Sequence, residues 1–88
     1  MVLYDITFSG RVQGVGFRWT ACRIAERFEV AGWVRNEADG TVRCVAEGKV
    51  SELDAFVEAV HEAMAGNITD TRTSQREGRG DLDGFTIQ

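Results

Sequence analysis

Large apolar residues recur at every second position at the start of the chain. Within residues 2–9 they are Val2, Tyr4, Ile6 and Phe8. This period-two spacing of β-branched and aromatic residues predicts a β-strand with one buried face. The segment that follows, Gly10–Gly16, contains three glycines and predicts a loop.

The apolar spacing becomes helical at Phe17. Further apolar residues follow at i+4, i+7, i+8 and i+11, namely Ala21, Ile24, Ala25 and Phe28. This spacing predicts a helix with a single apolar stripe. Arg18 falls outside the stripe, in the first turn of the predicted helix.

Two further strands, Val30–Asn36 and Thr41–Glu47, flank the turn Ala38-Asp39-Gly40. An Asp-Gly pair is typical of hairpin turns because glycine readily adopts the positive φ that such turns require. We therefore expect these two strands to pair as a β-hairpin.

A second helix is predicted after this hairpin, and two more strands after the helix. Ser51-Glu52-Leu53-Asp54 resembles a capping box, and Gly66 is placed to end the helix. Ile68–Arg76 predicts a strand only weakly, because Ile68 is its one strongly apolar residue. Phe85-Thr86-Ile87 predicts a short terminal strand. The helical stripe itself consists of Val50, Leu53, Val57, Val60 and Met64.

The order of these elements is β-α-β-β-α-β, with one possible extra strand. It predicts an α+β fold of the ferredoxin-like split-βαβ type, with an antiparallel sheet and two helices on one face. Residues 1–88 contain no proline, repeat or linker and are expected to form one domain. This fold alone does not determine function, because it occurs in RNA-binding proteins, metal chaperones and enzymes.

Charge and composition exclude several classes of protein. The net charge of −4 argues against non-specific nucleic-acid binding. Residues 1–50 carry seven bases and six acids, whereas residues 51–88 carry three and eight, so we expect any anion site in the first half. No apolar run is long enough to span a membrane, and the N-terminus does not resemble a signal peptide. Cys22 and Cys44 form neither a disulfide framework nor a metal motif, so we expect a cytoplasmic protein.

The glycine-rich segment Gly10-Arg11-Val12-Gln13-Gly14-Val15-Gly16-Phe17-Arg18 links the first strand to the first helix. Glycines let consecutive backbone N–H groups converge, and a helix N-terminus adds further donors. Arg18 could offer a planar fork to a phosphate at the same point. The segment matches neither a Walker A loop nor the dinucleotide fingerprint, whose third glycine would stand at Trp19. A tight turn with a surface arginine remains an equally open interpretation.

The other polar residues offer little conventional catalytic chemistry. Asn36 ends a predicted strand, where its amide could hold a water molecule or simply satisfy neighbouring backbone groups. His61 is expected on the solvent face of the second helix, and Asp81-Leu82-Asp83 lies in a polar loop rather than after an apolar strand. We expect no metal site. An enzyme without a metal ion, a nucleophile or a catalytic histidine would need a substrate with a reactive bond. An acyl phosphate qualifies, because its leaving group is a carboxylate whose conjugate acid has a pKa near 4.

Two segments resemble the acylphosphatase family. They are the loop from Gly10 to Arg18 and the strand Gly32-Trp33-Val34-Arg35-Asn36, followed by Asp39-Gly40 and Val45-Ala46-Glu47-Gly48. The resemblance covers essentially the whole chain and is most specific through Gly48. It implies a ferredoxin-like sandwich, and metal-free hydrolysis of small acyl phosphates to a carboxylate and inorganic phosphate.

The resemblance also implies roles for individual residues. Arg18 matches the family's phosphate-binding arginine, and Asn36 matches the asparagine that orients the attacking water. The backbone of Gln13, Gly14, Val15, Gly16 and Phe17 matches the phosphate cradle. It implies no cofactor, and we expect a monomer that binds neither nucleic acid nor a membrane.

The chain departs from the family pattern mainly in its second half. Phe28-Glu29-Val30 stands where the family has Leu-Gly-Leu, and losing that glycine would cost about 1 kcal/mol if a positive φ were retained. Ala65-Gly66-Asn67 replaces a Gly-Pro segment. The polar fourth strand leaves its register undetermined.

Three other functions are alternatives to acyl phosphate hydrolysis. An RNA-recognition domain would need stacking aromatics in the third strand, and Thr41–Glu47 has none. A metal chaperone would need a Cys-x-x-Cys loop, which is absent. A non-catalytic anion sensor stays open, although it would give Asn36 no evident task.

Overall fold

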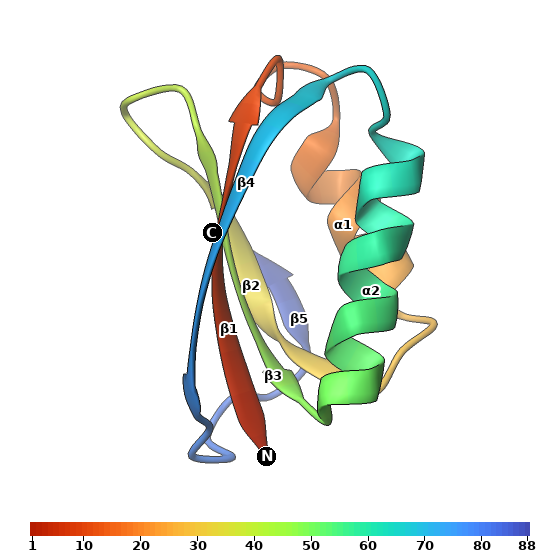
Figure 1. Ribbon diagram of the computed structural model, residues 1–88, viewed down its shortest axis with the longest axis vertical. Helices are drawn as coiled ribbons and strands as arrows, with labels where there is room; N and C mark the ends of the chain where they lie inside the picture. The colour runs from red at the N-terminus through yellow and green to blue at the C-terminus, as the bar shows by residue number, and fades with distance from the viewer.

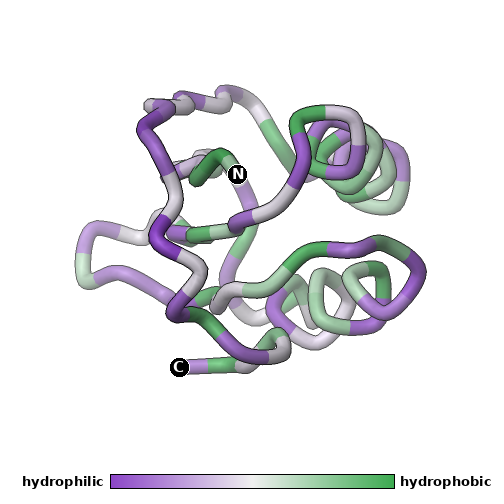
Figure 2. Tube along the Cα trace, turned by 90° about the horizontal axis from the view of Figure 1, so that it is seen from below, coloured by the Kyte–Doolittle hydropathy of each residue, from purple (hydrophilic) through white to green (hydrophobic).

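A computed structural model describes all 88 residues and places two helices side by side on one face of a five-stranded sheet (Figures 1 and 2). The other face of the sheet carries no helix. Neither helix has the length and hydropathy that a membrane-spanning helix needs. The elements are β1 (Val2–Gly10), α1 (Phe17–Ala25), β2 (Val30–Asn36), β3 (Val42–Gly48), α2 (Val50–Ala63), β4 (Ile68–Glu77) and β5 (Phe85–Ile87).

The sheet has the order β4-β1-β3-β2-β5, which confirms the predicted ferredoxin-like fold. The pairs β1–β3, β1–β4 and β2–β3 are antiparallel, but β5 pairs with β2 in parallel. The sheet is therefore mixed rather than wholly antiparallel. The reason is that the chain after β4 passes below the sheet, at the lower end of Figure 1, and enters β5 beside the start of β2.

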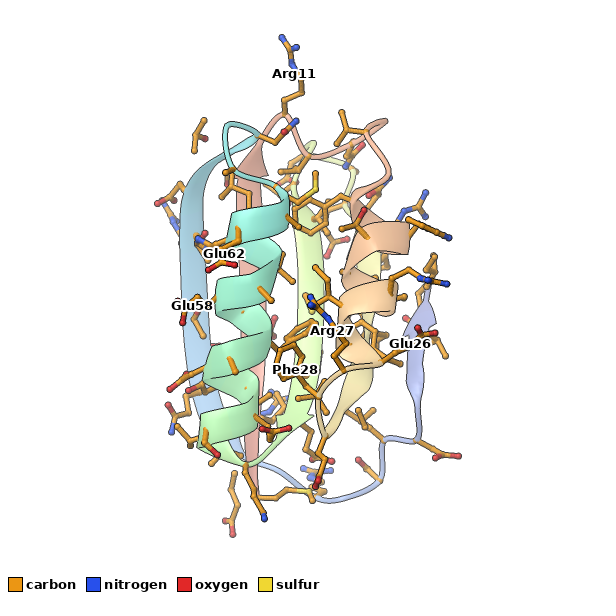
Figure 3. All side chains as sticks on the ribbon, turned by 90° about the vertical axis from the view of Figure 1, so that its right-hand side faces the viewer. Arg11, Glu26, Arg27, Phe28, Glu58 and Glu62 are labelled. Carbon is orange, nitrogen blue, oxygen red and sulfur yellow. The ribbon has the colours of Figure 1, made fainter.

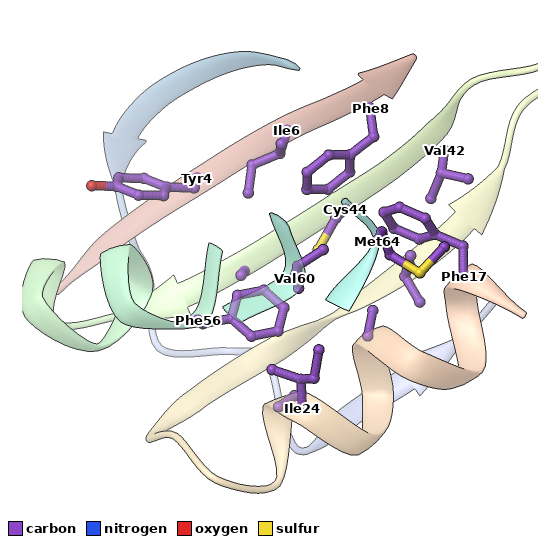
Figure 4. Packing of buried hydrophobic residues seen from close by; sticks show 14 of the residues in the cluster. Tyr4, Ile6, Phe8, Phe17, Ile24, Val42, Cys44, Phe56, Val60 and Met64 are labelled. Carbon is purple, nitrogen blue, oxygen red and sulfur yellow. The ribbon is translucent and has the colours of Figure 1, made fainter. Parts of the chain in front are cut away.

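One core lies between the sheet and the helices (Figure 4). It contains the apolar faces that the sequence spacing predicts. At the end of the core nearest the loop between β1 and α1, the rings of Phe8 and Phe17 lie 5.0 Å apart, which fixes the start of α1 against β1. At its other end Phe56 packs against Phe85, with ring centroids 5.4 Å apart, and so anchors β5.

Helix α1 is shorter than its apolar stripe predicts. It ends at Ala25, and the N–H groups of Arg27 and Phe28 bond to carbonyls three residues earlier. Phe28 still packs against the core from this tight turn. Glu29 stands where the family has a glycine. Because no residue other than glycine has a positive φ in this protein, Glu29 is not strained there. Its N–H donates instead to Oε1 of Glu52 at 2.8 Å.

The predicted capping box of the second helix is wrong. Helix α2 begins at Val50, so Ser51 lies inside it, and no side chain caps its N-terminus. Asp54, in this segment, makes a tertiary contact instead. Its Oδ1 accepts a hydrogen bond from the hydroxyl of Tyr4 at 2.7 Å. Gly66 follows the end of the helix with a φ of 89°, as expected of a terminating glycine.

Strand β4 is a full edge strand despite its polarity. It pairs with β1 from Val2↔Glu77 to Gly10↔Ile68, with a shift of register at Gly10. Most of its side chains are exposed, and polar residues suit an edge that must not recruit another strand. Gly10 is required at the shift, because a Cβ there would collide with the carbonyl oxygen of Asn67.

Candidate functional site

The loop between β1 and α1 turns on two glycines in left-handed conformations. Gly14 has a φ of 74° and Gly16 a φ of 77°, and Gly16 is the N-terminal cap of α1. Apart from the glycine itself and its two neighbours in the chain, no residue places an atom within 4 Å of where a Cβ would stand at either position. Glycine is therefore needed here for backbone conformation and not for space.

The backbone N–H groups of this loop have no partner in the protein. None of those from Gln13 to Trp19 donates a hydrogen bond to another backbone group, and the first helical bond runs from the Thr20 N–H to the Gly16 carbonyl. The first turn of α1 holds no acidic residue. Unpaired donors at a helix N-terminus create a positive potential that favours a bound anion.

The side chain of Gln13 ties the loop to the β2–β3 hairpin. Its Nε2 donates to the carbonyl oxygens of Glu37 at 2.8 Å and Thr41 at 3.0 Å. From the sequence only the backbone of Gln13 is expected at the site, because nothing in a single sequence indicates partners 24 and 28 residues away. Through these bonds the loop is held against the strand end that carries Asn36.

Arg18 is a half-buried residue in the first turn of α1 with no carboxylate partner. Four other arginines form ion pairs within the protein. Among them, Arg43 makes bonds of 2.9 and 2.6 Å to the two carboxylate oxygens of Asp5, and Arg35 lies 3.1 Å from Glu37. Arg18 forms no ion pair within 4 Å. Its planar fork is therefore available to an anion from outside the chain.

Asn36 lies at the end of β2, opposite Val42 of β3, and its side-chain oxygen is buried without a hydrogen-bond partner. The alternative that this oxygen satisfies neighbouring backbone groups is thus not realised. Leaving such an acceptor unpaired costs about 1–3 kcal/mol, so an unsatisfied buried oxygen suggests a place for water or ligand.

Arg18, Asn36, Gly14, Gly16 and Phe17 line a single hollow of about 180 Å³. Of the other residues predicted for the site, Gln13 reaches toward the hairpin and the side chain of Val15 is exposed. The hollow is also lined by Val12, Trp19 and Ile87, which the sequence does not predict as site residues. The only sequence signal for Trp19 was its position next to Arg18, and Ile87 gave none.

A larger hollow, of about 520 Å³, lies between α2 and β4. Its charged lining includes the carboxylates of Asp54 and Glu58, which repel an anion. His61 also lines it, exposed, with Nε2 3.1 Å from the hydroxyl of Thr71. This hollow is less suited to a phosphoryl group than the smaller one.

The remaining chemically active side chains lie apart from the smaller hollow. Burial raises the pKa of both thiols, strongly for Cys44 and less for Cys22, so neither is activated as a thiolate nucleophile. Asp81 and Asp83 are exposed in the loop before β5. No three His, Cys, Asp or Glu side chains are grouped so as to hold a metal ion.

The chain is similar in sequence to known proteins of one family. The acylphosphatase family model matches residues 4–87. An acylphosphatase of Bacillus licheniformis is 40% identical over 86 residues, which cover 97% of this chain and 92% of that protein. An acylphosphatase of Salinibacter ruber is 59% identical over 54 residues, but these cover 61% of this chain and only 57% of that protein.

Solved structures lead to the same family. The crystal structure of acylphosphatase from Bacillus subtilis superimposes with a TM-score of 0.92 at 38% identity, over 100% of this chain and 99% of that one. The match thus extends from the loop and strand that the motifs identify to the whole fold. This chain belongs to the acylphosphatase family.

Proposed function

We propose that the protein is an acylphosphatase that hydrolyses the carboxyl–phosphate bond of small acyl phosphates. The observation that carries the proposal is the coincidence of three unpaired groups at one hollow. They are the backbone donors of residues 13–17, of which Gly14, Gly16 and Phe17 line the hollow, the guanidinium of Arg18 and the buried oxygen of Asn36. The first two suit a phosphoryl group, and the third suits a water molecule.

In this proposal the phosphoryl oxygens accept hydrogen bonds from the loop N–H groups and from the fork of Arg18. Phosphoryl transfer depends mainly on positioning and on stabilising charge at the transferred group. Donors that are already fixed in place need no reorganisation as the charge develops. The glycines hold the loop in shape, and Gln13 holds it against the hairpin.

Asn36 positions the nucleophile. Its oxygen accepts a hydrogen bond from a water molecule, which attacks phosphorus opposite the leaving oxygen. The bond between phosphorus and the acyl oxygen breaks, and both its electrons leave with the carboxylate. This leaving group needs no general acid, because carboxylic acids have a pKa near 4. The proton of the attacking water passes to an oxygen of the phosphate product.

We propose further that the reaction needs neither a metal ion nor a cofactor, since the positive charge comes from Arg18 and the backbone. The sequence also leads us to propose that residues 1–88 act as a single domain in a cytoplasmic monomer that does not bind nucleic acid. Size-exclusion chromatography with light scattering would test the monomer: a dimer mass would contradict it.

The test is hydrolysis of benzoyl phosphate in excess EDTA, with p-nitrophenyl phosphate as the control substrate. We expect turnover of the acyl phosphate alone, and loss of that turnover in Arg18→Ala. Arg72→Ala is a matched control, since Arg72 is an exposed arginine of β4 that does not line the hollow. If the folded protein did not hydrolyse benzoyl phosphate, or if Arg18→Ala kept full activity, the proposal would be wrong.

A further inference from the structure

Exposed apolar side chains gather at the site. Five large apolar residues are exposed in the whole chain, and three of them belong to the loop or the hollow: Val15, Trp19 and Ile87. Trp19 is 63% exposed and Ile87 47%. Single exposed apolar residues are ordinary, but a group of them beside a concave polar site indicates contact with a ligand.

Trp19 and Ile87 reach the hollow from two different elements. Trp19 directly follows Arg18 on α1, and Ile87 pairs in register with Val34 of β2, two residues before Asn36. Ile87 lies two residues after Phe85 on the same strand, so both side chains point to the same face of the sheet. Phe85 packs against Phe56 of α2. Its side chain therefore faces the helix layer, beside the polar groups that would hold the phosphoryl group.

The indole of Trp19 also contacts an arginine that does not line the hollow. The guanidinium of Arg23 lies 5.4 Å from the centroid of the ring, and Arg23 lines a separate neighbouring hollow together with Trp19. Arg23 does not line the hollow that contains Asn36, where Arg18 is the only charged residue. The indole thus separates a charged surface from an otherwise uncharged rim.

The size of the hollow determines where an acyl group must lie. Its volume of about 180 Å³ is below the range of about 300–1,000 Å³ that is usual for ligand pockets. If the loop and Arg18 hold the phosphoryl group, the acyl group lies at the rim of the hollow, where Trp19 and Ile87 are exposed. No second cation lines the hollow to receive another anionic group of the same substrate.

We propose that Trp19 and Ile87 form an apolar subsite for the acyl group, so that the enzyme prefers apolar, and above all aromatic, acyl phosphates. Acetyl phosphate and acyl phosphates that carry a second anionic group are poorer substrates. This proposal rests on the proposed function. Apolar contacts of this kind discriminate by about tenfold or more in kcat/KM, and an open rim belongs at the low end of that range.

The experiment measures kcat/KM for benzoyl phosphate and acetyl phosphate with the wild type, Trp19→Ala, Trp19→Phe and Ile87→Ser. Val50→Ser is the matched control, because Val50 is a similarly exposed apolar residue at the start of α2, away from the hollow. We expect Trp19→Ala to lower the benzoyl-to-acetyl ratio about tenfold, Ile87→Ser to lower it less, and Trp19→Phe to retain it. Inhibition by inorganic phosphate stays unchanged.

An unchanged ratio in both Trp19→Ala and Ile87→Ser would overturn the subsite and leave the proposed function intact. Equal loss of activity toward both substrates, with weaker phosphate inhibition, would also overturn it, because Trp19 would then act on the phosphate loop. Failure of the wild type to hydrolyse either acyl phosphate would overturn the proposed function and the subsite together. Because both side chains are exposed, these variants are expected to fold.

Discussion

Two loops at opposite ends of the sheet each direct several backbone N–H groups toward one place. They differ in whether a carboxylate of the protein accepts hydrogen bonds from these groups. In the loop after β4, the N–H of Arg79 donates to Glu47 at 2.7 Å and the N–H of Gly80 donates to the same carboxylate at 3.1 Å. Glu47 is only 3% exposed. In the loop after β1, the corresponding donors and Arg18 face the hollow without an internal anion.

In the proposed function, this difference separates a structural anion site from a functional one. The carboxylate of Glu47 belongs to the chain, so its loop is satisfied as soon as the protein folds. The donors of the loop from Gln13 to Phe17 stay unpaired within the protein, and we propose that an anion from solution binds them. Arg43 and Arg18 differ in the same way, since Arg43 is held by Asp5 and Arg18 by no carboxylate.

The largest effect is expected from Arg18→Lys, which keeps the charge but removes the planar fork. Turnover of benzoyl phosphate should fall by about 10³-fold or more, and inhibition by inorganic phosphate should weaken as well, because the fork contacts both ground and transition states. Steady-state kinetics would measure both, with far-UV circular dichroism to verify folding. Turnover like that of the wild type would contradict the bidentate role of Arg18.

Asn36→Ala should separate turnover from binding. We expect kcat to fall by about 10²–10³-fold, as for the loss of a preorganised hydrogen-bonding group, while phosphate inhibition changes little. Urea denaturation should show no loss of stability, because the Asn36 oxygen makes no hydrogen bond within the protein. A parallel loss of phosphate binding and turnover would argue against a role in positioning water.

Gln13→Met tests whether the free loop needs its attachment to the hairpin. The variant keeps the length of the side chain but loses the bonds to the Glu37 and Thr41 carbonyls. A displacement of the loop by about 1 Å would lower kcat/KM by up to about 100-fold. Gln75→Met, an exposed change on β4, is the control. If the two variants had equal activity, the loop would hold its shape without Gln13.

Glu47→Gln tests the opposite loop. Replacing the buried carboxylate removes the charge from its hydrogen bonds, and hydrogen bonds to charged groups contribute about 1.5–3 kcal/mol. We expect the free energy of unfolding in urea to fall by an amount of this order, with kcat/KM unchanged. Glu58→Gln serves as an exposed control. A loss of activity in the folded variant would mean that the two loops do not act independently.

The pair Asp5–Arg43 should produce a small dependence of stability on pH. Hydrogen bonds from Arg43 lower the pKa of Asp5 below its usual 3.8. The pair therefore stabilises the fold fully above about pH 4, and this contribution is lost as the pH falls through the lowered pKa of the folded protein. Between pH 5 and 2 the wild type should lose up to about 1 kcal/mol more than Asp5→Asn in urea titrations. Parallel curves would contradict this.

Local sequence patterns predicted most of the fold and the core of the candidate site. The strand ending at Asn36 was predicted with its full bounds, and the loop and Arg18 were recognised from adjacent residues. Local patterns failed where tertiary contacts decide the outcome. Asp54 binds Tyr4 instead of completing a cap, and Phe28 packs on the core from a turn beyond the end of α1.

The features that the sequence did not predict all depend on distant partners. Gln13 bonds to residues 24 and 28 positions away, and Glu47 accepts from N–H groups more than 30 positions away. Ile87 joins the hollow only because β5 lies beside β2 in parallel. A single sequence contains no periodic signal for such contacts, since the topology of the sheet brings them together.

The most direct measurement is a titration of the ¹⁵N-labelled protein with inorganic phosphate, followed by the backbone amide signals. Saturable shifts should concentrate on the amides of residues 13–18 and disappear in Arg18→Ala, while the amides of Arg79 and Gly80 stay in place because Glu47 already binds them. Shifts that concentrate elsewhere, or that persist without Arg18, would contradict the assignment of the phosphoryl site to the loop after β1.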